Sequence, residues 1–209
     1  MIVGYIHICQ KGEWKRSLGM IIRSLKKTGL YENSHIIRLG IVSDDGDLKP
    51  DPILDEPKFE IAHIGKSKEY ERPTLLHMKK SADTDPSDTL YYYLHTKGIT
   101  HFGTDKEQNV IDWIELMLYW NIERWDLAVQ ALKTYDMYGC NHIHGHYSGN
   151  FWWATIQHVK KLHKSIGNGY CDPELWAPKH IECKKKNIYG SGLEGFGHYN
   201  HRYPRDKYV

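Results

Sequence analysis

The chain has 209 residues, of which 40% are hydrophobic and 26% charged, a composition typical of a globular protein and not of a disordered or fibrous one. The net charge of only +2 argues against a general nucleic-acid binder, and no apolar run reaches the roughly 20 residues that a membrane span needs. The 15 Tyr, 7 Trp and 14 His carry rings that suit sugars and phosphates, so we expect a site for a polar ligand.

Strand and helix patterns alternate through the first half of the chain. Short β-branched or aromatic runs predict strands over residues 2–8, 35–43, 59–64 and 90–94. The last of these, LYYYL, is the clearest central strand. Apolar residues at helical spacing predict helices over residues 14–25, which Gly29 would end, and 74–81, which follow Pro73. Residues 49–57 carry three prolines and are expected to form a loop.

The second half continues the mixture. We expect helices over residues 107–134, strands over 138–144 and 151–156, and a further helix over 158–162. The tail from about Lys184 is expected to be irregular and free to close over a site. Together these patterns predict a single α/β domain over residues 1–209, with an open sheet of mixed strand directions flanked by helices. Ligands of such sheets bind beyond the carboxyl ends of the strands.

The four cysteines and the start of the chain indicate a cytoplasmic protein. The cysteines include no Cys-x-x-Cys pair, which is typical of free thiols in a reducing compartment. Residues 1–10 are apolar but have no basic leader, so we interpret them as a buried strand and not as a signal peptide.

Polar side chains follow the strand predicted over residues 90–94. His95, Thr96 and Lys97 bring an imidazole, a hydroxyl and an ammonium to its carboxyl end, where they could cradle a phosphate. A solvated strand end would also explain Lys97. Ser148, Gly149 and Asn150 precede an aromatic strand, and its alternation turns Trp152 away from the core, toward a sugar. A turn before a core strand remains the alternative.

Histidines and carboxylates form two further candidate sites. His142, His144 and His146 alternate, so in a strand they would share one face and could hold zinc, although a polar strand face is an alternative. Asp172 and Glu174 lie beside a tryptophan, where a carboxylate could orient an acceptor hydroxyl or stabilise a developing cation. A carboxylate that caps a helix would give the same pattern.

Taken together, these segments resemble the GT-A glycosyltransferases, and in particular a viral and bacterial group with an LHTKG strand end and an SGNFWWA segment. The likeness covers residues 5–14, 70–75, 90–98, 113–132, 139–154 and 174–176. It implies a GT-A fold and transfer of a hexose, such as rhamnose, from a UDP-linked donor to a glycan acceptor. Viral members glycosylate capsid proteins, which would place the chain in the host cytoplasm, as part of a longer multidomain protein.

The resemblance also implies roles for single residues. His7, Gln10, Arg72 and Thr74 would border the nucleotide with residues 95–97. Residues 148–150 resemble an element that faces the donor and acceptor sugars in retaining enzymes, which favours retention of configuration. Glu174, followed by an aromatic segment, would be the acceptor or catalytic carboxylate, with Asp172 beside it.

In one respect the sequence departs from this family. GT-A enzymes hold Mn²⁺ with Asp-x-Asp after the central strand, where this chain has residues 95–97. Asp83-Thr84-Asp85 fits that pattern as text but precedes the strand, so we expect it at the wrong end of the sheet. Either His95 and His198 bind the divalent cation, or Lys97 neutralises the diphosphate directly.

Two rival functions would use the same residues differently. A metal-dependent hydrolase would bind zinc through His142, His144 and His146. A non-catalytic carbohydrate-binding domain would use exposed Trp and Tyr rings and would have no affinity for a nucleotide sugar.

Overall fold

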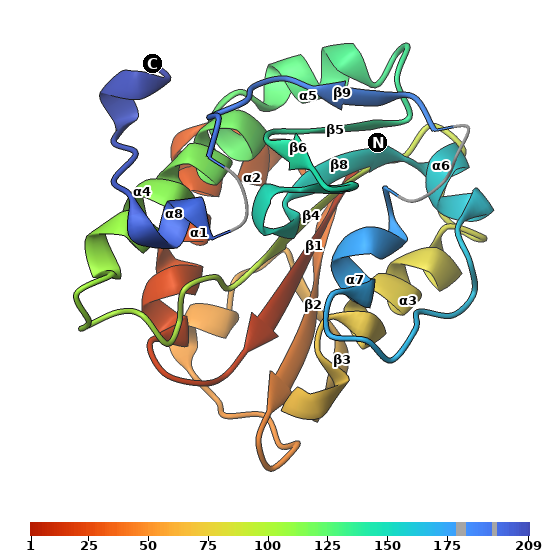
Figure 1. Cartoon of the computed structure of the whole chain (residues 1–209). Coiled ribbons are helices and arrows are strands. Elements are labelled where there is room, and N and C mark those ends of the chain that lie inside the picture. Colours follow the sequence, from red (N-terminus) through yellow and green to blue (C-terminus); the bar gives the residue numbers. More distant parts are fainter. Residues whose placement is uncertain (179–182, 194–195) are drawn as a thin grey trace.

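A seven-stranded mixed sheet forms the centre of the computed structural model, which describes residues 1–178, 183–193 and 196–209 (Figure 1). Its strand order is β3-β2-β1-β4-β8-β5-β9. The strands of this sheet are β1 (Ile2–Cys9), β2 (Ile36–Ser43), β3 (Phe59–Lys66), β4 (Leu90–His95), β5 (Met137–Gly139), β8 (Trp152–Thr155) and β9 (Lys185–Asn187). A separate two-stranded hairpin consists of β6 (His142–Ile143) and β7 (His146–Tyr147).

The chain reverses its direction of winding between β1 and β4. From β1 it moves outward through β2 and β3, and it then returns to add β4 on the other side of β1. These four strands are parallel, and His7 of β1 lies in register with His95 of β4. β8 pairs antiparallel with β4. The carboxyl ends of β1 and β4 therefore meet at the switch point of the sheet, where open α/β folds bind ligands.

Helices cover both faces of the sheet because the central strands are apolar on both sides. Alternate residues of β1 enter two cores, Ile6 and Ile8 on one face and Val3 and Tyr5 on the other. The first core includes side chains of α1 (Trp14–Lys27), α2 (Leu30–Asn33), α4 (Glu107–Leu118) and α5 (Trp125–Ala131). The second includes side chains of α3 (Arg72–Ser81), α6 (Ile156–Lys161) and α7 (Asp172–Trp176). Each helix that the structure describes is too short or too polar to cross a bilayer.

The predicted α/β class with a mixed sheet flanked by helices is confirmed, and β4 lies at its centre. Gly29 follows α1 with a φ of 75°, a conformation that suits glycine at the end of a helix. The helix expected over residues 107–134 is divided by a π-helical turn at Tyr119–Glu123.

The tail was expected to be irregular, and this is wrong in part. Residues 185–187 form β9, which extends the sheet beside β5, and α8 (Gly197–Asn200) follows. Farther on, Tyr203 and Tyr208 pack against Leu116 and Tyr119 of the α4 region. The tail is thus packed against the domain at several points.

Candidate functional site

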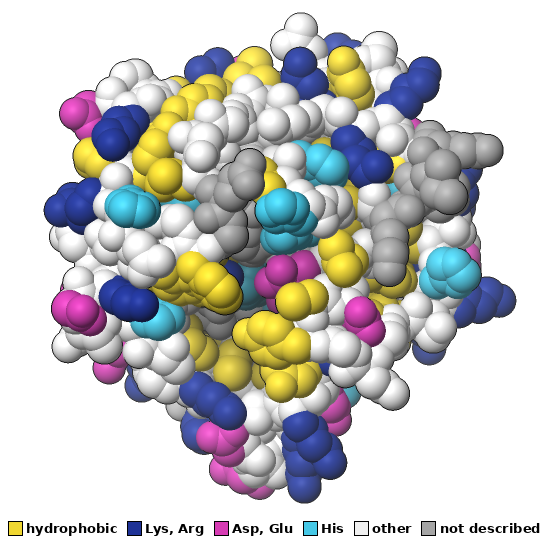
Figure 2. All heavy atoms as spheres, viewed as in Figure 1, with side chains coloured by type: hydrophobic (Ala, Val, Ile, Leu, Met, Phe, Trp, Pro, Cys, Tyr) yellow, Lys and Arg dark blue, Asp and Glu magenta, His cyan; other side chains and the backbone are white. Residues whose placement is uncertain are grey.

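A cleft of about 280 Å³ opens at the carboxyl ends of β1 and β4. Acidic, histidine and apolar side chains gather near the centre of the face shown in Figure 2. The residues lining the cleft come from the strand ends, the start of α3 and the start of α7: His7, Cys9, Lys11, Val42, Ser67, Tyr70, Glu71, His95, Thr96, Lys97, Ile99, Thr100, Tyr170, Pro173 and Glu174. The structure therefore brings together His7, residues 95–97 and Glu174, five of the residues singled out from the sequence.

Two buried histidines form part of the cleft wall. His7 and His95 are only 3% and 9% exposed, and burial lowers the pKa of each imidazole to about 4. The positive charge of Lys97 also lowers the pKa of His95. His7 Nδ1 lies 2.8 Å from the hydroxyl of Thr74, and His95 Nε2 lies 2.5 Å from the carbonyl oxygen of Gly149. Because a carbonyl oxygen only accepts, Nε2 of His95 carries the hydrogen. Both rings are neutral at pH 7.

Lys97 brings a positive charge to the cleft. Its backbone N–H and carbonyl are both bonded to the hydroxyl of Ser17, at 2.9 and 3.0 Å. Its ammonium lies 4.4 Å from the ring centre of Trp113 and 5.9 Å from that of Tyr199. Cation–π contacts hold the charge without neutralising it. Within residues 1–178, 183–193 and 196–209, no carboxylate forms an ion pair with Lys97.

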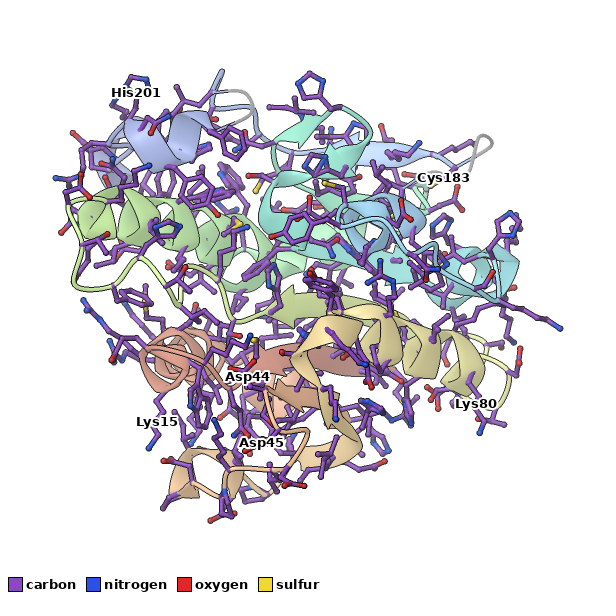
Figure 3. All side chains as sticks on the ribbon, turned by 60° about the horizontal axis from the view of Figure 1, so that its bottom comes forward. Lys15, Asp44, Asp45, Lys80, Cys183 and His201 are labelled. Carbon is purple, nitrogen blue, oxygen red and sulfur yellow. The ribbon has the colours of Figure 1, made fainter. Side chains whose placement is uncertain are left out.

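Lys11 is the other lysine that lines the cleft. Its ammonium lies 2.5 Å from a carboxylate oxygen of Asp44, which follows β2 (Figure 3). Of the two lysines, Lys97 is therefore the one available to an anionic ligand.

Glu174 is the carboxylate of α7 that faces the cleft. Its Oε2 lies 3.6 Å from Nε2 of His146, and both side chains are about one-quarter exposed, at 26% and 28%. Burial lowers the pKa of His146, whereas the charge of Glu174 opposes this shift. Asp172 was expected to share the catalytic role, but it does not line the cleft. Its carboxylate accepts a hydrogen bond from the backbone N–H of Gly169 (2.8 Å) and orders the loop before α7.

Glu71 was missed by the sequence analysis. It lines the cleft just before α3, and its Oε2 accepts hydrogen bonds from the Tyr93 hydroxyl (2.6 Å) and the Asn150 amide (2.7 Å). No local motif marks this residue, because its partners lie 22 and 79 positions away along the chain.

Residues 148–150 lie behind the cleft and bond to residues that line it or support it. The hydroxyl of Ser148 accepts a hydrogen bond from the indole of Trp113 (2.7 Å), and Gly149 presents its carbonyl to His95. Asn150 is fully buried and donates to Glu71. Ser148, Gly149 and Asn150, which were expected to face a sugar, do not line the cleft, but Gly149 and Asn150 bond to His95 and Glu71, which do.

Trp152 does not present its ring to a ligand either, so that expectation is wrong. It is fully buried, stacks on Tyr93 at 5.2 Å between ring centres, and donates its indole N–H to Asn150 (2.8 Å). The expectation assumed that one face of β8 meets solvent. Helices cover both faces of this sheet, so both sides of β8 are buried.

Three residues that were expected to border the nucleotide do not line the cleft, and their side chains bond to neighbouring parts of the protein instead. The buried side-chain amide of Gln10 bonds the backbone of Lys49 twice, at 2.8 and 2.9 Å. The guanidinium of Arg72 donates to the carbonyls of Gly167 (2.7 Å) and Gly169 (2.6 Å). Thr74 orients His7, as described above.

The Nε2 atoms of His95 and His198, the two histidines expected to bind a divalent cation, both lie within hydrogen-bond distance of other polar groups. His198 is buried and stacks on Trp113, and its Nε2 lies 3.0 Å from the Ser191 hydroxyl and 3.3 Å from the Asn141 amide. Burial lowers its pKa to about 4. His95 directs the hydrogen on Nε2 at Gly149. Within the part of the chain that the structure describes, no group of three or more His, Cys, Asp or Glu side chains could hold a metal ion.

The three alternating histidines do not lie on one strand face, which corrects another expectation. His142 is in β6 and His146 is in β7, whereas His144 and Gly145 form the turn between them with φ of 52° and 85°. The strand expected over residues 138–144 breaks at Asn141, whose φ is 49°.

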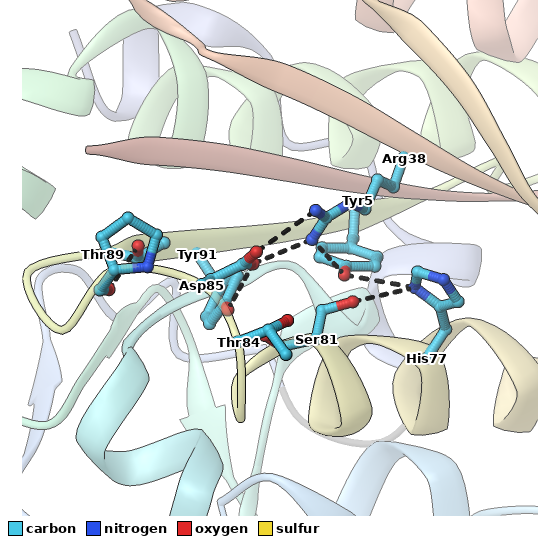
Figure 4. Close-up of polar contacts among 9 residues, drawn as sticks. Tyr5, Arg38, His77, Ser81, Thr84, Asp85, Thr89 and Tyr91 are labelled. Atoms are coloured by element: carbon cyan, nitrogen blue, oxygen red, sulfur yellow. Dashed lines mark hydrogen bonds and ion pairs between the residues drawn. The ribbon is translucent and has the colours of Figure 1, made fainter.

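The Asp83-Thr84-Asp85 segment lies at the amino end of β4, as expected. Asp85 forms an ion pair with Arg38, with N–O distances of 2.8 and 3.3 Å, and accepts a hydrogen bond from the hydroxyl of Tyr91 (2.8 Å; Figure 4). Arg38 also donates to the hydroxyl of Tyr5 (3.0 Å). Asp85 is thus part of a structural network at the end of the sheet opposite the cleft.

A comparison of the sequence with models of protein families gives no match, and no curated protein is significantly similar to it.

Proposed function

We propose that the chain is a glycosyltransferase that takes a hexose from a UDP-linked donor and transfers it to a glycan. The observation that carries this proposal is the pairing of charges in the cleft. Lys97, without a carboxylate partner among the described residues, and Glu174 line the same cleft at the switch point of the sheet. The resemblance to GT-A enzymes narrows the proposal to a rhamnose-type hexose, a capsid-protein glycan and the cytoplasm of a host cell.

The reaction needs a cation on one side of the sugar and a carboxylate on the other. When the bond between the sugar C1 and the diphosphate oxygen breaks, negative charge develops on the diphosphate and positive charge on the sugar. The ammonium of Lys97 would stabilise the leaving diphosphate, because a fixed positive charge in a cleft acts most strongly where charge develops. The carboxylate of Glu174 would stabilise the positive charge that develops on the sugar. In a reaction with retention, the acceptor hydroxyl attacks from the face that the diphosphate leaves, and its proton passes to the leaving diphosphate.

The size of the cleft suits part of a donor. Small-molecule pockets enclose roughly 300–1,000 Å³, and this cleft, at about 280 Å³, lies just below that range. The sugar and diphosphate would fill it, and the nucleoside would extend over the rim. Because the Nε2 atoms of His95 and His198 have other hydrogen-bond partners, we assign the positive charge to Lys97, and the experiment below decides the role of Mn²⁺. The likeness of residues 148–150 to retaining enzymes favours retention.

A calorimetric titration of the protein with UDP, GDP and their hexose conjugates, with and without Mn²⁺, tests this function. We expect a UDP-sugar to bind, and UDP to be released when a glycan acceptor is added. Binding of glycans without affinity for any nucleotide sugar would support a carbohydrate-binding domain instead. Tightly bound zinc with hydrolysis of the substrate would support the metal-dependent hydrolase.

A further inference from the structure

Glu71 presents a carboxylate whose orientation is fixed from three parts of the fold. The residue precedes α3, its first hydrogen-bond donor, Tyr93, lies on β4, and its second, Asn150, follows the β6–β7 hairpin. Tyr93 and Asn150 are both fully buried, and both donate to the same oxygen, Oε2. A group held by buried partners is preorganised and loses little freedom when a ligand binds.

The second oxygen of Glu71, Oε1, accepts no hydrogen bond from the residues that the structure describes. Nor does any described cation form an ion pair with this carboxylate. Its neighbours in the cleft wall, His7 and His95, are neutral rings. Around Glu71 the cleft therefore carries a negative charge, and one of the two carboxylate oxygens has no donor among the described residues.

This charge determines which part of a ligand can lie there. A carboxylate repels the oxygens of a phosphate and attracts hydroxyl hydrogens, with which it forms strong charge-assisted hydrogen bonds. Lys97, in the same cleft, carries a positive charge and attracts phosphate oxygens. The diphosphate and the sugar of one donor would thus be drawn to different places.

Two exposed tyrosines at the rim add apolar surface. Tyr70 and Tyr170 are 43% and 74% exposed, and their rings meet edge to face with centres 5.4 Å apart. Tyr70 has a φ of 53° and a ψ of −144°, a backbone conformation that is unfavourable for a residue with a Cβ, and residues strained in this way cluster at functional sites. Such rings can cover the C–H face of a pyranose while its hydroxyls bond to polar groups.

We infer that the part of the cleft beside Glu71 is a hexose subsite, in which Glu71 accepts a hydrogen bond from a hydroxyl of the transferred sugar and the Tyr70–Tyr170 pair covers its apolar face. The inference rests on the proposed function and extends it by naming the residues that recognise the sugar instead of the nucleotide.

The test compares the affinities of UDP-hexose and UDP for the wild-type protein and Glu71→Gln. The amide oxygen of glutamine can still accept from Tyr93 and Asn150, so the variant should fold. We expect the affinity for UDP-hexose to fall by about tenfold or more, the scale for losing one hydrogen bond to a charged group, and the affinity for UDP to stay unchanged. The matched control is Glu69→Gln, which removes a carboxylate two residues away that pairs with His63 outside the cleft. The control should change neither affinity.

Different outcomes separate this inference from the proposed function. An unchanged UDP-hexose affinity in Glu71→Gln, or an equal loss for UDP and UDP-hexose, would overturn the hexose subsite and leave the proposed function standing. A wild-type protein that binds neither ligand would contradict the proposed function itself. If Glu71→Gln fails to fold, the same affinities are measured for Tyr93→Phe. This variant keeps the Glu71 carboxylate but removes one of the two groups that donate hydrogen bonds to it. A smaller loss confined to UDP-hexose supports the subsite, and no loss overturns it.

Discussion

Replacing Asp85 with Asn should destabilise the protein strongly without affecting nucleotide binding. The Asp85 carboxylate and the Arg38 guanidinium are 11% and 15% exposed, and Tyr91 donates a further hydrogen bond to the carboxylate (Figure 4). The variant keeps the shape of the side chain but leaves the charge of Arg38 without a counter-ion. The loss of stability therefore comes from removing one negative charge from a partly buried network. The structure of the cleft, at the other end of β4, should not change.

Breaking a buried ion pair by removing one partner costs roughly 3–5 kcal/mol. Because this pair retains some exposure, we expect about 3 kcal/mol, the lower end of that range. In a chain of this size, about 3 kcal/mol corresponds to a fall in melting temperature of roughly 6–12 °C. Asp83→Asn is the matched control. Asp83 is exposed and its side chain forms no hydrogen bond or ion pair with the described residues, so its change should remain within about 0.5 kcal/mol.

The stabilisation by Asp85 should also depend on pH. Burial raises the pKa of this carboxyl, but hydrogen bonds from Arg38 and Tyr91 outweigh burial and leave the pKa below its usual value. A depressed pKa in the folded state stabilises the protein above the unfolded pKa of about 3.9 and loses that effect as the pH falls through the folded value. The difference in free energy of unfolding between the wild type and Asp85→Asn should therefore have its full value at pH 7 and decrease below about pH 4.

These effects are measured by thermal and urea unfolding of the wild type, Asp85→Asn and Asp83→Asn at pH 7 and pH 3. UDP is then titrated into the folded proteins at 25 °C. Equal stability of Asp83→Asn and Asp85→Asn would refute the structural role of Asp85. Loss of a Mn²⁺ effect or of UDP binding in Asp85→Asn, at unchanged stability, would show that the Asp-x-Asp segment is the metal motif after all.

Two further predictions concern the cleft and the segment behind it. Gly149→Ala should lower the free energy of unfolding by about 2 kcal/mol or more, as measured by urea unfolding. The φ of Gly149 is 60°, and a Cβ there would lie 2.2 Å from Sδ of the buried Met117. An unchanged free energy of unfolding would mean that residues 148–150 are not held as described. Glu174→Gln should lower turnover by roughly a hundredfold or more at unchanged donor affinity, with Glu32→Gln on α2 as the inert control, and normal turnover would leave Glu174 a structural residue.

The sequence predicted those parts of the fold in which local pattern and burial agree. LYYYL was expected to be a central strand, and Tyr91, Tyr92 and Tyr93 are indeed buried with neighbouring rings on both faces of the sheet. The same strand predicted that His95 and Lys97 lie at its carboxyl end. Both residues line the cleft there, because the end of a strand determines where the next side chains lie.

The parts that could not be predicted depend on contacts between distant segments. Arg72 was expected to border the nucleotide, but its guanidinium donates to carbonyls of Gly167 and Gly169, 95 and 97 residues later. Glu71 became recognisable as a site residue only when its two buried donors were placed beside it. Trp152 was misplaced because alternation along a strand does not show whether the outer face is covered by helices.

The claim that a nucleotide sugar binds at the carboxyl ends of β1 and β4 is tested most directly by titrating UDP into Lys97→Met and Lys15→Met. Methionine keeps much of the apolar stem against Trp113 and removes only the charge, whereas Lys15 pairs with Asp51 outside the cleft and lies at the periphery of the molecule (Figure 3). We predict that Lys97→Met weakens UDP binding by about tenfold or more while Lys15→Met binds as the wild type does. Equal affinity in the two folded variants would contradict the placement of the diphosphate beside Lys97.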